Sequence, residues 1–305
     1  MQQHLMGWES FEKKVASMIK NPETKKFYEA HPYPSQKIES ASDLHARKHE
    51  EIMERILFCL DTDKKEIGNK TLLDAGCGTG EKSLYFAMLG AKSTGFDISK
   101  SSIGIARANA KKLGLDAKFI VDSFEDFNME GKEIHGMEEK QKQGMKGNRL
   151  HGMGNNGKYD FVICIGSLHH SADPKGNFMR MASLVKPGGS MCAGLYHKCG
   201  RVRTKIKRML LWHGESDFEK VIAKTGIWEG APKTAYANVA DRLASPRESY
   251  HTIGEVKSWF EDAGFNGMKT YPEANLDSKK DVFMKELEWL AGSMGFFFMG
   301  GKKKA

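Results

Sequence analysis

The stretch Leu72-Leu73-Asp74-Ala75-Gly76-Cys77-Gly78-Thr79-Gly80 decides the fold of this chain. Two branched apolar residues and an acid precede three glycines that alternate with small residues. This pattern predicts a buried strand, a tight turn and a helix that begins near Glu81. Because glycine permits backbone conformations and close approaches that a Cβ forbids, the loop can lie directly against a ligand. The unpaired amides of the helix start would face that ligand.

A second strand-like run, Lys92–Asp97, also ends in a carboxylate. A glycine loop after one strand and an acid after the next is how an open α/β sheet holds an adenosine ribose. The dinucleotide fingerprint is incomplete, because Glu81 stands where its third glycine or alanine belongs and would repel a pyrophosphate. A phosphate loop ending in Gly-Lys-Ser/Thr is also absent. A purely structural turn and another nucleotide fold remain as alternatives.

With Asp74 leading it, the glycine run resembles the first motif of class I S-adenosylmethionine-dependent methyltransferases. The resemblance covers about residues 42–196 and 252–303. It implies an α/β, Rossmann-like fold, in which helices cover both faces of a mostly parallel, seven-stranded sheet whose last strand runs antiparallel. The segment Leu168-His169-His170 resembles the "LHH" segment of the methyltransferase type 11-like subgroup, which includes quinone-biosynthesis enzymes.

Further strands and helices follow from periodicity and capping residues. Ser99 and Asp173 are expected to cap helices, and Thr252 with Glu255 forms the sequence of a capping box. The run 187–189, Pro-Gly-Gly, is expected to end the helix that starts at Asp173. The later strands are predicted at Ala117–Val121, Tyr159–Ile165, Ser190–Tyr196, Gly267–Tyr271 and Gly295–Gly300.

Residues 1–41 lie outside this scaffold and are interpreted as an N-terminal lid or extension. Residues 42–305 form the predicted methyltransferase domain, with insertions at about 131–157 and 197–251. The first insertion is polar and lacks periodicity, which indicates a solvated loop. Residues 1–41 and the second insertion should both lie near the carboxyl ends of the strands, as candidate lids or as peripheral packing. The prolines of the run Phe27–Pro34 predict an extended path within the N-terminal segment.

The family resemblance assigns roles around the cofactor S-adenosyl-L-methionine. It implies that Asp74 approaches the ammonium group, while Asp97 accepts hydrogen bonds from both ribose hydroxyls. The glycines let the backbone contact the methionine part, Ile98 packs against adenine, and an acid and a serine after the third strand contact the adenine edge. The full predicted cofactor set is Asp74, Gly76, Cys77, Gly78, Gly80, Asp97, Ile98, Asp122, Ser123 and Ile165.

Three residues after the fourth and fifth strands are candidates for the chemistry. His169 would take a proton from the acceptor, and Tyr196 and His197 are second candidates for contacting it. A structural role is favoured for His170. Methyl transfer needs no strong base, so positioning of the two reactants should dominate.

Composition limits the class of protein. The 305 residues contain no apolar run of the roughly 18 residues that a membrane span requires, and no secretory signal is recognised. Five scattered cysteines without a CxxC pair favour reduced thiols over a zinc site, so no metal is expected. A cytoplasmic protein is therefore predicted.

The acceptor is left open by the sequence. A small-molecule or lipid-like acceptor is the leading hypothesis, because no Asn/Asp-Pro-Pro-Tyr/Phe motif follows the fourth strand. The net charge of +8 and the basic segment 201–208 leave methylation of tRNA or another RNA as the alternative. A cofactor-binding regulatory protein without catalysis is a further alternative.

Overall fold

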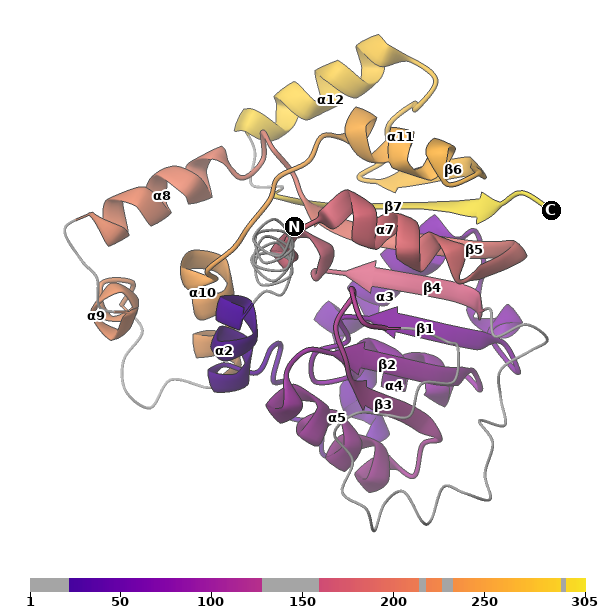
Figure 1. The fold of residues 1–305 in the computed structure, drawn as a ribbon, viewed down its shortest axis with the longest axis horizontal. Helices are drawn as coiled ribbons and strands as arrows, with labels where there is room; N and C mark the ends of the chain where they lie inside the picture. Colours follow the sequence, from indigo (N-terminus) through magenta and orange to yellow (C-terminus); the bar gives the residue numbers. More distant parts are fainter. Residues whose placement is uncertain (1–21, 128–158, 214–217, 227–232, 292–294) are drawn as a thin grey trace, which may run out of the picture.

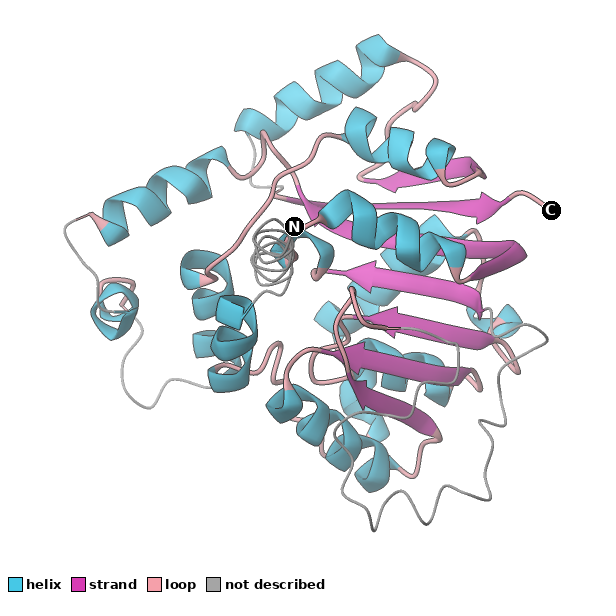
Figure 2. Ribbon diagram, viewed as in Figure 1, coloured by secondary structure: helices cyan, strands magenta, loops and turns pink. Residues whose placement is uncertain are grey.

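The computed structural model describes residues 22–127, 159–213, 218–226, 233–291 and 295–305. Seven strands form one sheet in the order β3-β2-β1-β4-β5-β7-β6 (Figures 1 and 2). The neighbours from β3 to β5 pair in parallel, and β7 pairs antiparallel with both β5 and β6, which confirms the predicted fold class. The strands are β1 (Thr71–Ala75), β2 (Lys92–Asp97), β3 (Ala117–Val121), β4 (Tyr159–Ile165), β5 (Val185–Tyr196), β6 (Phe265–Tyr271) and β7 (Phe296–Lys303).

The glycine run begins at the end of a central strand. All five positions of β1 are buried, because β2 and β4 flank it and helices cover both sheet faces. The helices α3 (Arg47–Leu60), α4 (Glu81–Met88) and α5 (Lys100–Leu113) pack on one face. The other face is covered by α7 (Pro174–Ser183), α11 (Ile253–Asp262) and α12 (Lys279–Ala291).

Most predicted helix boundaries agree with the structure. Ser99 Oγ accepts the Ser102 amide at 3.0 Å, and Asp173 Oδ1 accepts the Gly176 amide at 2.9 Å. In the described ranges, 3-10 turns accompany the helices at η1 (Ala41–His45), η2 (Lys64–Glu66) and η3 (Leu168–His170).

The end of α7 was predicted wrongly. The helix stops at Ser183, and β5 already begins at Val185, so the Pro-Gly-Gly run lies inside the strand. Tyr159 pairs with Val185 and Phe161 with Ser190, so the run forms an irregular step in the register. A bulge of this kind tolerates a proline, which has no amide to donate.

The predicted capping box of α11 is only half formed. Thr252 Oγ1 accepts the Glu255 amide at 3.1 Å, as expected. The Glu255 carboxylate bonds His251 Nδ1 at 2.9 Å instead of returning to the Thr252 amide. A neighbouring imidazole therefore supplies the second partner that the sequence pattern assigned to the backbone.

Four helices outside the common scaffold lie beyond the carboxyl ends of the parallel strands (Figure 1). They are α2 (Pro22–Ala30), α8 (Val202–Trp212), α9 (Phe218–Ala223) and α10 (Lys233–Ala244). The extended path predicted for Phe27–Pro34 was wrong in its first half, because the helix continues to Ala30. The predicted insertion at 131–157 lies outside the described residues. Within the ranges that the structure describes, no helix is both long and apolar enough to span a membrane.

Candidate cofactor and acceptor site

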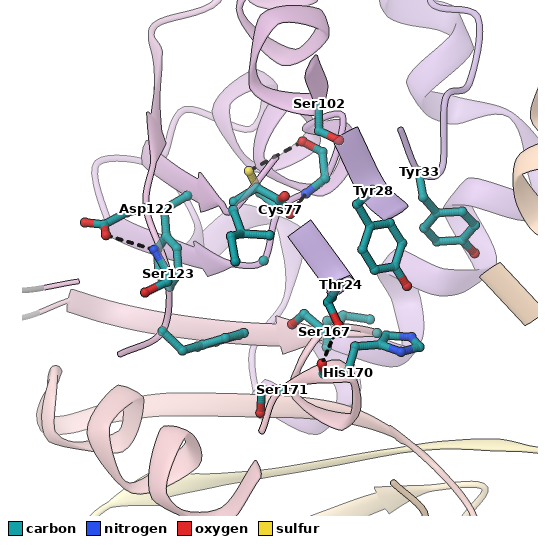
Figure 3. Close-up of a pocket in the computed structure, with 18 of the residues that line it drawn as sticks. Thr24, Tyr28, Tyr33, Cys77, Ser102, Asp122, Ser123, Ser167, His170 and Ser171 are labelled. Carbon is teal, nitrogen blue, oxygen red and sulfur yellow. Dashed lines mark hydrogen bonds between the residues drawn. The ribbon is translucent and has the colours of Figure 1, made fainter. Parts of the chain in front are cut away.

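A pocket opens at the carboxyl edge of the sheet, between the glycine loop and the N-terminal segment (Figure 3). Tyr28 and Tyr33 lie toward one side of the view, and Asp122 and Ser123 lie toward the other. Most of the predicted cofactor residues line this pocket: Gly76, Cys77, Gly78, Asp97, Ile98, Asp122, Ser123 and Ile165.

At two positions of the loop, the backbone conformation and the close approach of other residues require glycine. Gly76 and Gly78 have φ of 73° and 56°, a region that side chains rarely adopt. A Cβ on Gly76 would lie 2.3 Å from Ser167 Cβ, and one on Gly78 would lie 2.2 Å from the Tyr33 carbonyl oxygen. The loop can therefore approach both the end of β4 and the N-terminal segment only without side chains at these positions.

Asp74 and Gly80 do not line the pocket. Gly80 has φ of 89°, and a Cβ there would lie within 2.9 Å of Ala106 and Phe119 side-chain atoms. The third glycine thus serves the packing of α4 against α5 and β3, and its contact with methionine stays a prediction. Asp74 is fully buried and accepts a hydrogen bond from Ser83 Oγ at 2.8 Å. Its approach to the ammonium group stays a prediction.

Asp97 is placed to hold two hydroxyls. Its Oδ2 accepts the Gly78 amide and its Oδ1 accepts the Ser99 amide, each at 2.9 Å. Because a carboxylate offers about four lone-pair sites, each oxygen keeps an acceptor position for a ligand in the pocket. Burial raises the pKa of Asp97 above its ordinary value, while the two amide hydrogen bonds lower it.

The end of β3 supplies a mixed polar and apolar wall. The Asp122 carboxylate accepts the Ser123 amide at 2.8 Å, and burial raises the pKa of Asp122. The Phe124 ring also lines the pocket and meets Phe96 edge to face, with 5.4 Å between centroids. A flat heterocycle with a polar edge suits such a wall.

The structure places the two histidines of η3 differently from the expectation. His170 lines the pocket, and its Nδ1 lies 2.7 Å from the Arg247 carbonyl oxygen. His169 is fully buried and stacks on Tyr196 with 3.7 Å between ring centroids. Neither His169 nitrogen has a hydrogen-bond partner among the described residues, and burial lowers its pKa well below the ordinary value. His169 is therefore neutral and packed behind the site, which does not support the predicted role as base.

Tyr196 and His197 also lie away from the pocket lining. Tyr196 Oη donates to Asp241 Oδ2 at 3.0 Å, so its hydroxyl is committed to α10. His197 is fully buried, with its ring against Trp289 at 4.3 Å between centroids. Both side chains pack in the layer behind the pocket, and their contact with an acceptor stays a prediction.

Sequence reasoning missed several residues that line the pocket. Thr24, Tyr28 and Tyr33 come from the N-terminal segment, and Ser167 and Ser171 flank the histidines. Tyr28 Oη donates to Asp241 Oδ1 at 2.6 Å, which joins α2 to α10. The His-Pro-Tyr-Pro run at 31–34 is the sequence feature that could have indicated Tyr33, because its two prolines restrict the backbone path that brings Tyr33 to the glycine loop.

We expect acid to destabilise the fold through His169. Since its pKa is lowered in the folded state, the unfolded chain takes up a proton near pH 6.5 that the folded chain does not. Stability should therefore fall as pH falls through that value, by up to about 1.4 kcal/mol per pH unit. Urea unfolding of His169→Phe should show a weaker pH dependence, but a remaining one, because burial lowers the pKa of His49 to about 4. An unchanged slope would contradict this assignment.

The sheet order, the glycine loop and the acid that ends β2 together define the class I S-adenosylmethionine-dependent methyltransferase fold. A family model described as "Methyltransferase domain" matches residues 44–270. The chain belongs to this family.

The chain spans only part of the length of the curated relatives that it matches. The chain is 24% identical over 277 residues to an uncharacterized protein of Synechococcus, covering 90% of this chain and 58% of that protein. It is 32% identical over 120 residues to a ubiquinone biosynthesis O-methyltransferase of Proteus mirabilis, covering 39% of each. A crystal structure of magnesium protoporphyrin IX methyltransferase from Synechocystis with bound SAH shares the fold. Its TM-score is 0.50 at 15% identity, covering 96% of this chain and 100% of that chain.

Proposed function

We propose that this chain is an S-adenosylmethionine-dependent methyltransferase that acts on a small-molecule or lipid-like acceptor. The observation that carries the proposal is one continuous pocket with two unlike ends. Asp97 and the glycine loop form one part, while Tyr28, Tyr33 and His170 belong to another. The name of the Proteus relative, a ubiquinone biosynthesis O-methyltransferase, supports a small acceptor.

The residues present fit the cofactor. Asp97 would hold the ribose, Asp122 and Ser123 the adenine edge, and Ile98 the adenine face. Cys77 and Ile165 complete the wall. Asp74 Oδ1 is buried without a hydrogen-bond partner among the described residues, so it has an acceptor position left for an ammonium group. When bound, S-adenosylmethionine supplies an electrophilic methyl group on a sulfonium whose leaving group is neutral.

The chain's own contribution is positioning and proton transfer. We assign the proton to His170 Nδ1, because only a donor satisfies the Arg247 carbonyl at 2.7 Å. In this tautomer the lone pair lies on Nε2, a buried atom, which would take the proton of an acceptor hydroxyl brought against the ring. Asp241 Oδ1 lies 3.6 Å from Nε2 and would stabilise the imidazolium that forms. Positioning of the two reactants lowers the activation free energy by about 7–11 kcal/mol, whereas a general base accelerates the reaction by about 10²–10⁴-fold.

The N-terminal segment and the second insertion act in this proposal as a lid. The Thr79 amide donates to the Tyr33 carbonyl at 3.1 Å, which seats the segment on the glycine loop. Tyr28 then connects the segment to Asp241 of α10. A cytoplasmic location belongs to the same proposal, and the buried, unbridged thiols support it: Cys59, Cys77, Cys164 and Cys192.

The basic segment gives little support to an RNA acceptor. Arg201 is buried, lies over the Tyr196 ring at 3.7 Å and pairs with Glu248 at 3.3 Å. Arg208 pairs with the same carboxylate at 3.1 Å. Two of the cations expected to bind phosphate are therefore paired with a carboxylate of the protein itself.

His170→Gln should lower kcat by about 10²–10⁴-fold, because it removes the proton acceptor and keeps a polar side chain of similar length. The affinity for S-adenosylmethionine should stay the same. The matched variant His169→Gln should lower stability and leave kcat closer to that of the wild type. An equal loss of kcat in both variants would contradict the assignment to His170.

Incubation with methyl-labelled S-adenosylmethionine and fractionated extract tests the function as a whole. Label in a small organic or lipid fraction is the expected result. Label in RNA would establish the alternative acceptor. Tight cofactor binding without transfer to any fraction would move the chain to the regulatory class.

A further inference from the structure

Helix α8 carries an apolar ridge that none of the other described elements covers. Ile206 is 50% exposed, and Met209 and Leu210 are each 65% exposed. These three residues are spaced i, i+3 and i+4, so they form one stripe along the helix. Large aliphatic side chains with this much exposure mark an interaction surface when they lie together.

Cations flank the ridge. Arg203 and Lys207 follow each other at i, i+4 on one side of the stripe, and both are exposed. Lys205 lies on the other side, with its ammonium 3.9 Å from the centroid of the Tyr250 ring. No acidic residue occurs in the sequence from Val202 to Trp212. An apolar stripe between basic side chains is the arrangement of helices that lie in the interface of an anionic bilayer.

The opposite side of α8 fixes the helix to the site. Trp212 Nε1 donates to the Leu243 carbonyl at 2.9 Å, and Arg208 bonds the Ser245 carbonyl, so α8 rests on α10 and the turn after it. Asp241 of α10 in turn bonds Tyr28, which lines the pocket. The ridge is thus connected to the pocket through one helix.

We infer that the ridge of Ile206, Met209 and Leu210, with its flanking cations, docks the protein on anionic phospholipid membranes. The inference deepens the proposed function, on which it rests: an acceptor that is lipid-like would be met at such a surface. RNA fits less well, because the centre of the exposed face is aliphatic and offers neither cations to phosphates nor rings for stacking on bases.

A second exposed apolar patch provides the internal control. On α12, Phe283, Met284, Leu287 and Leu290 are exposed by 41–58%. Acids are interspersed along that helix, at Asp281, Glu286 and Glu288. The same helix carries three lysines (Lys279, Lys280 and Lys285), so its charges balance, whereas α8 carries cations alone. A similar apolar exposure without a net positive flank separates non-specific hydrophobic adsorption from recognition of an anionic surface.

The test is co-sedimentation of the full chain with phosphatidylcholine vesicles that contain or lack phosphatidylglycerol. We expect binding to the anionic vesicles, weakened by salt and by about fivefold for each of Arg203→Gln and Lys207→Gln. The double variant Met209→Asp, Leu210→Asp should lose at least about tenfold. Leu287→Asp should bind as the wild type does.

Several outcomes would overturn the inference. One is equal binding to both vesicle types, and another is a loss of vesicle binding in Leu287→Asp as large as that in the ridge variant. A third is self-association of the chain in ultracentrifugation that Met209→Asp abolishes. A fourth is retention on RNA that the aspartate variants leave unchanged. Titration with S-adenosylmethionine is run on each protein in parallel. If the unmodified chain binds the cofactor but not the anionic vesicles, the docking surface alone is contradicted, whereas absent cofactor binding by the unmodified chain counts against the proposed function.

Discussion

Asp97→Ala should weaken binding of S-adenosylmethionine by about 100-fold or more. The carboxylate is expected to accept two ribose hydroxyls, and each hydrogen bond to a charged group is worth about 1.5–3 kcal/mol. Isothermal titration measures the effect. Asp97→Asn should lose about tenfold, because its amide keeps one acceptor oxygen in place of two.

Asp160→Ala is the matched control for Asp97→Ala. Asp160 also accepts a backbone amide at a strand end, from Thr71 at 2.8 Å, but it does not line the pocket. This variant should lose stability and keep cofactor affinity. Unchanged cofactor affinity in Asp97→Ala, or the same loss of cofactor affinity in both variants, would contradict the assignment of the ribose to Asp97.

Gly78→Ala should displace the N-terminal segment and lower stability by about 2–5 kcal/mol. A Cβ would approach the Tyr33 carbonyl oxygen to 2.2 Å, a distance that backbone atoms cannot accommodate. Any side chain at this left-handed backbone position also lowers stability by about 1–2 kcal/mol. The hydrogen bonds from Thr79 N to Tyr33 O and from Ser35 N to Thr79 Oγ1 would be lost with the movement. Faster proteolysis within residues 22–41 and weaker cofactor binding are the measurements.

Gly114→Ala is the control that separates the cost of backbone strain from the effect of contact with the N-terminal segment. Gly114 has φ of 64° at the end of α5, and nothing lies within 4 Å of where its Cβ would be. It should cost about 1–2 kcal/mol and leave both the proteolysis of residues 22–41 and the cofactor affinity unchanged. If Gly78→Ala behaved no differently from Gly114→Ala, the N-terminal segment would not be seated on the glycine loop.

The sequence predicted what local pattern and backbone chemistry determine. The strand that ends at Ala75, the turn through Gly76 and Gly78, and the acid at Asp97 all follow from residue types at fixed spacing, and the structure brings them to one edge. The Pro-Gly-Gly run misled because the same residues that stop a helix also form a bulge, and only strand pairing decides between them.

The acceptor side of the pocket was harder to predict because its residues meet only through tertiary contacts. Which of His169 and His170 faces the pocket depends on the direction of a single 3-10 turn, which no spacing encodes. Tyr28 and Asp241 are 213 positions apart in the sequence, and nothing near either one indicates the other. The motif also does not tell which side of the turn each glycine faces, so the packing of Gly80 against Ala106 and Phe119 could not be predicted.

The glycine loop and Asp97 should hold S-adenosylmethionine rather than a dinucleotide. Titration of the unmodified chain with S-adenosylhomocysteine and, separately, with NAD distinguishes the two ligands. We predict binding of S-adenosylhomocysteine at one site per chain and no binding of NAD, since Glu81 stands where the dinucleotide fingerprint needs its third glycine or alanine. Binding of NAD, or binding of neither ligand, would contradict the account.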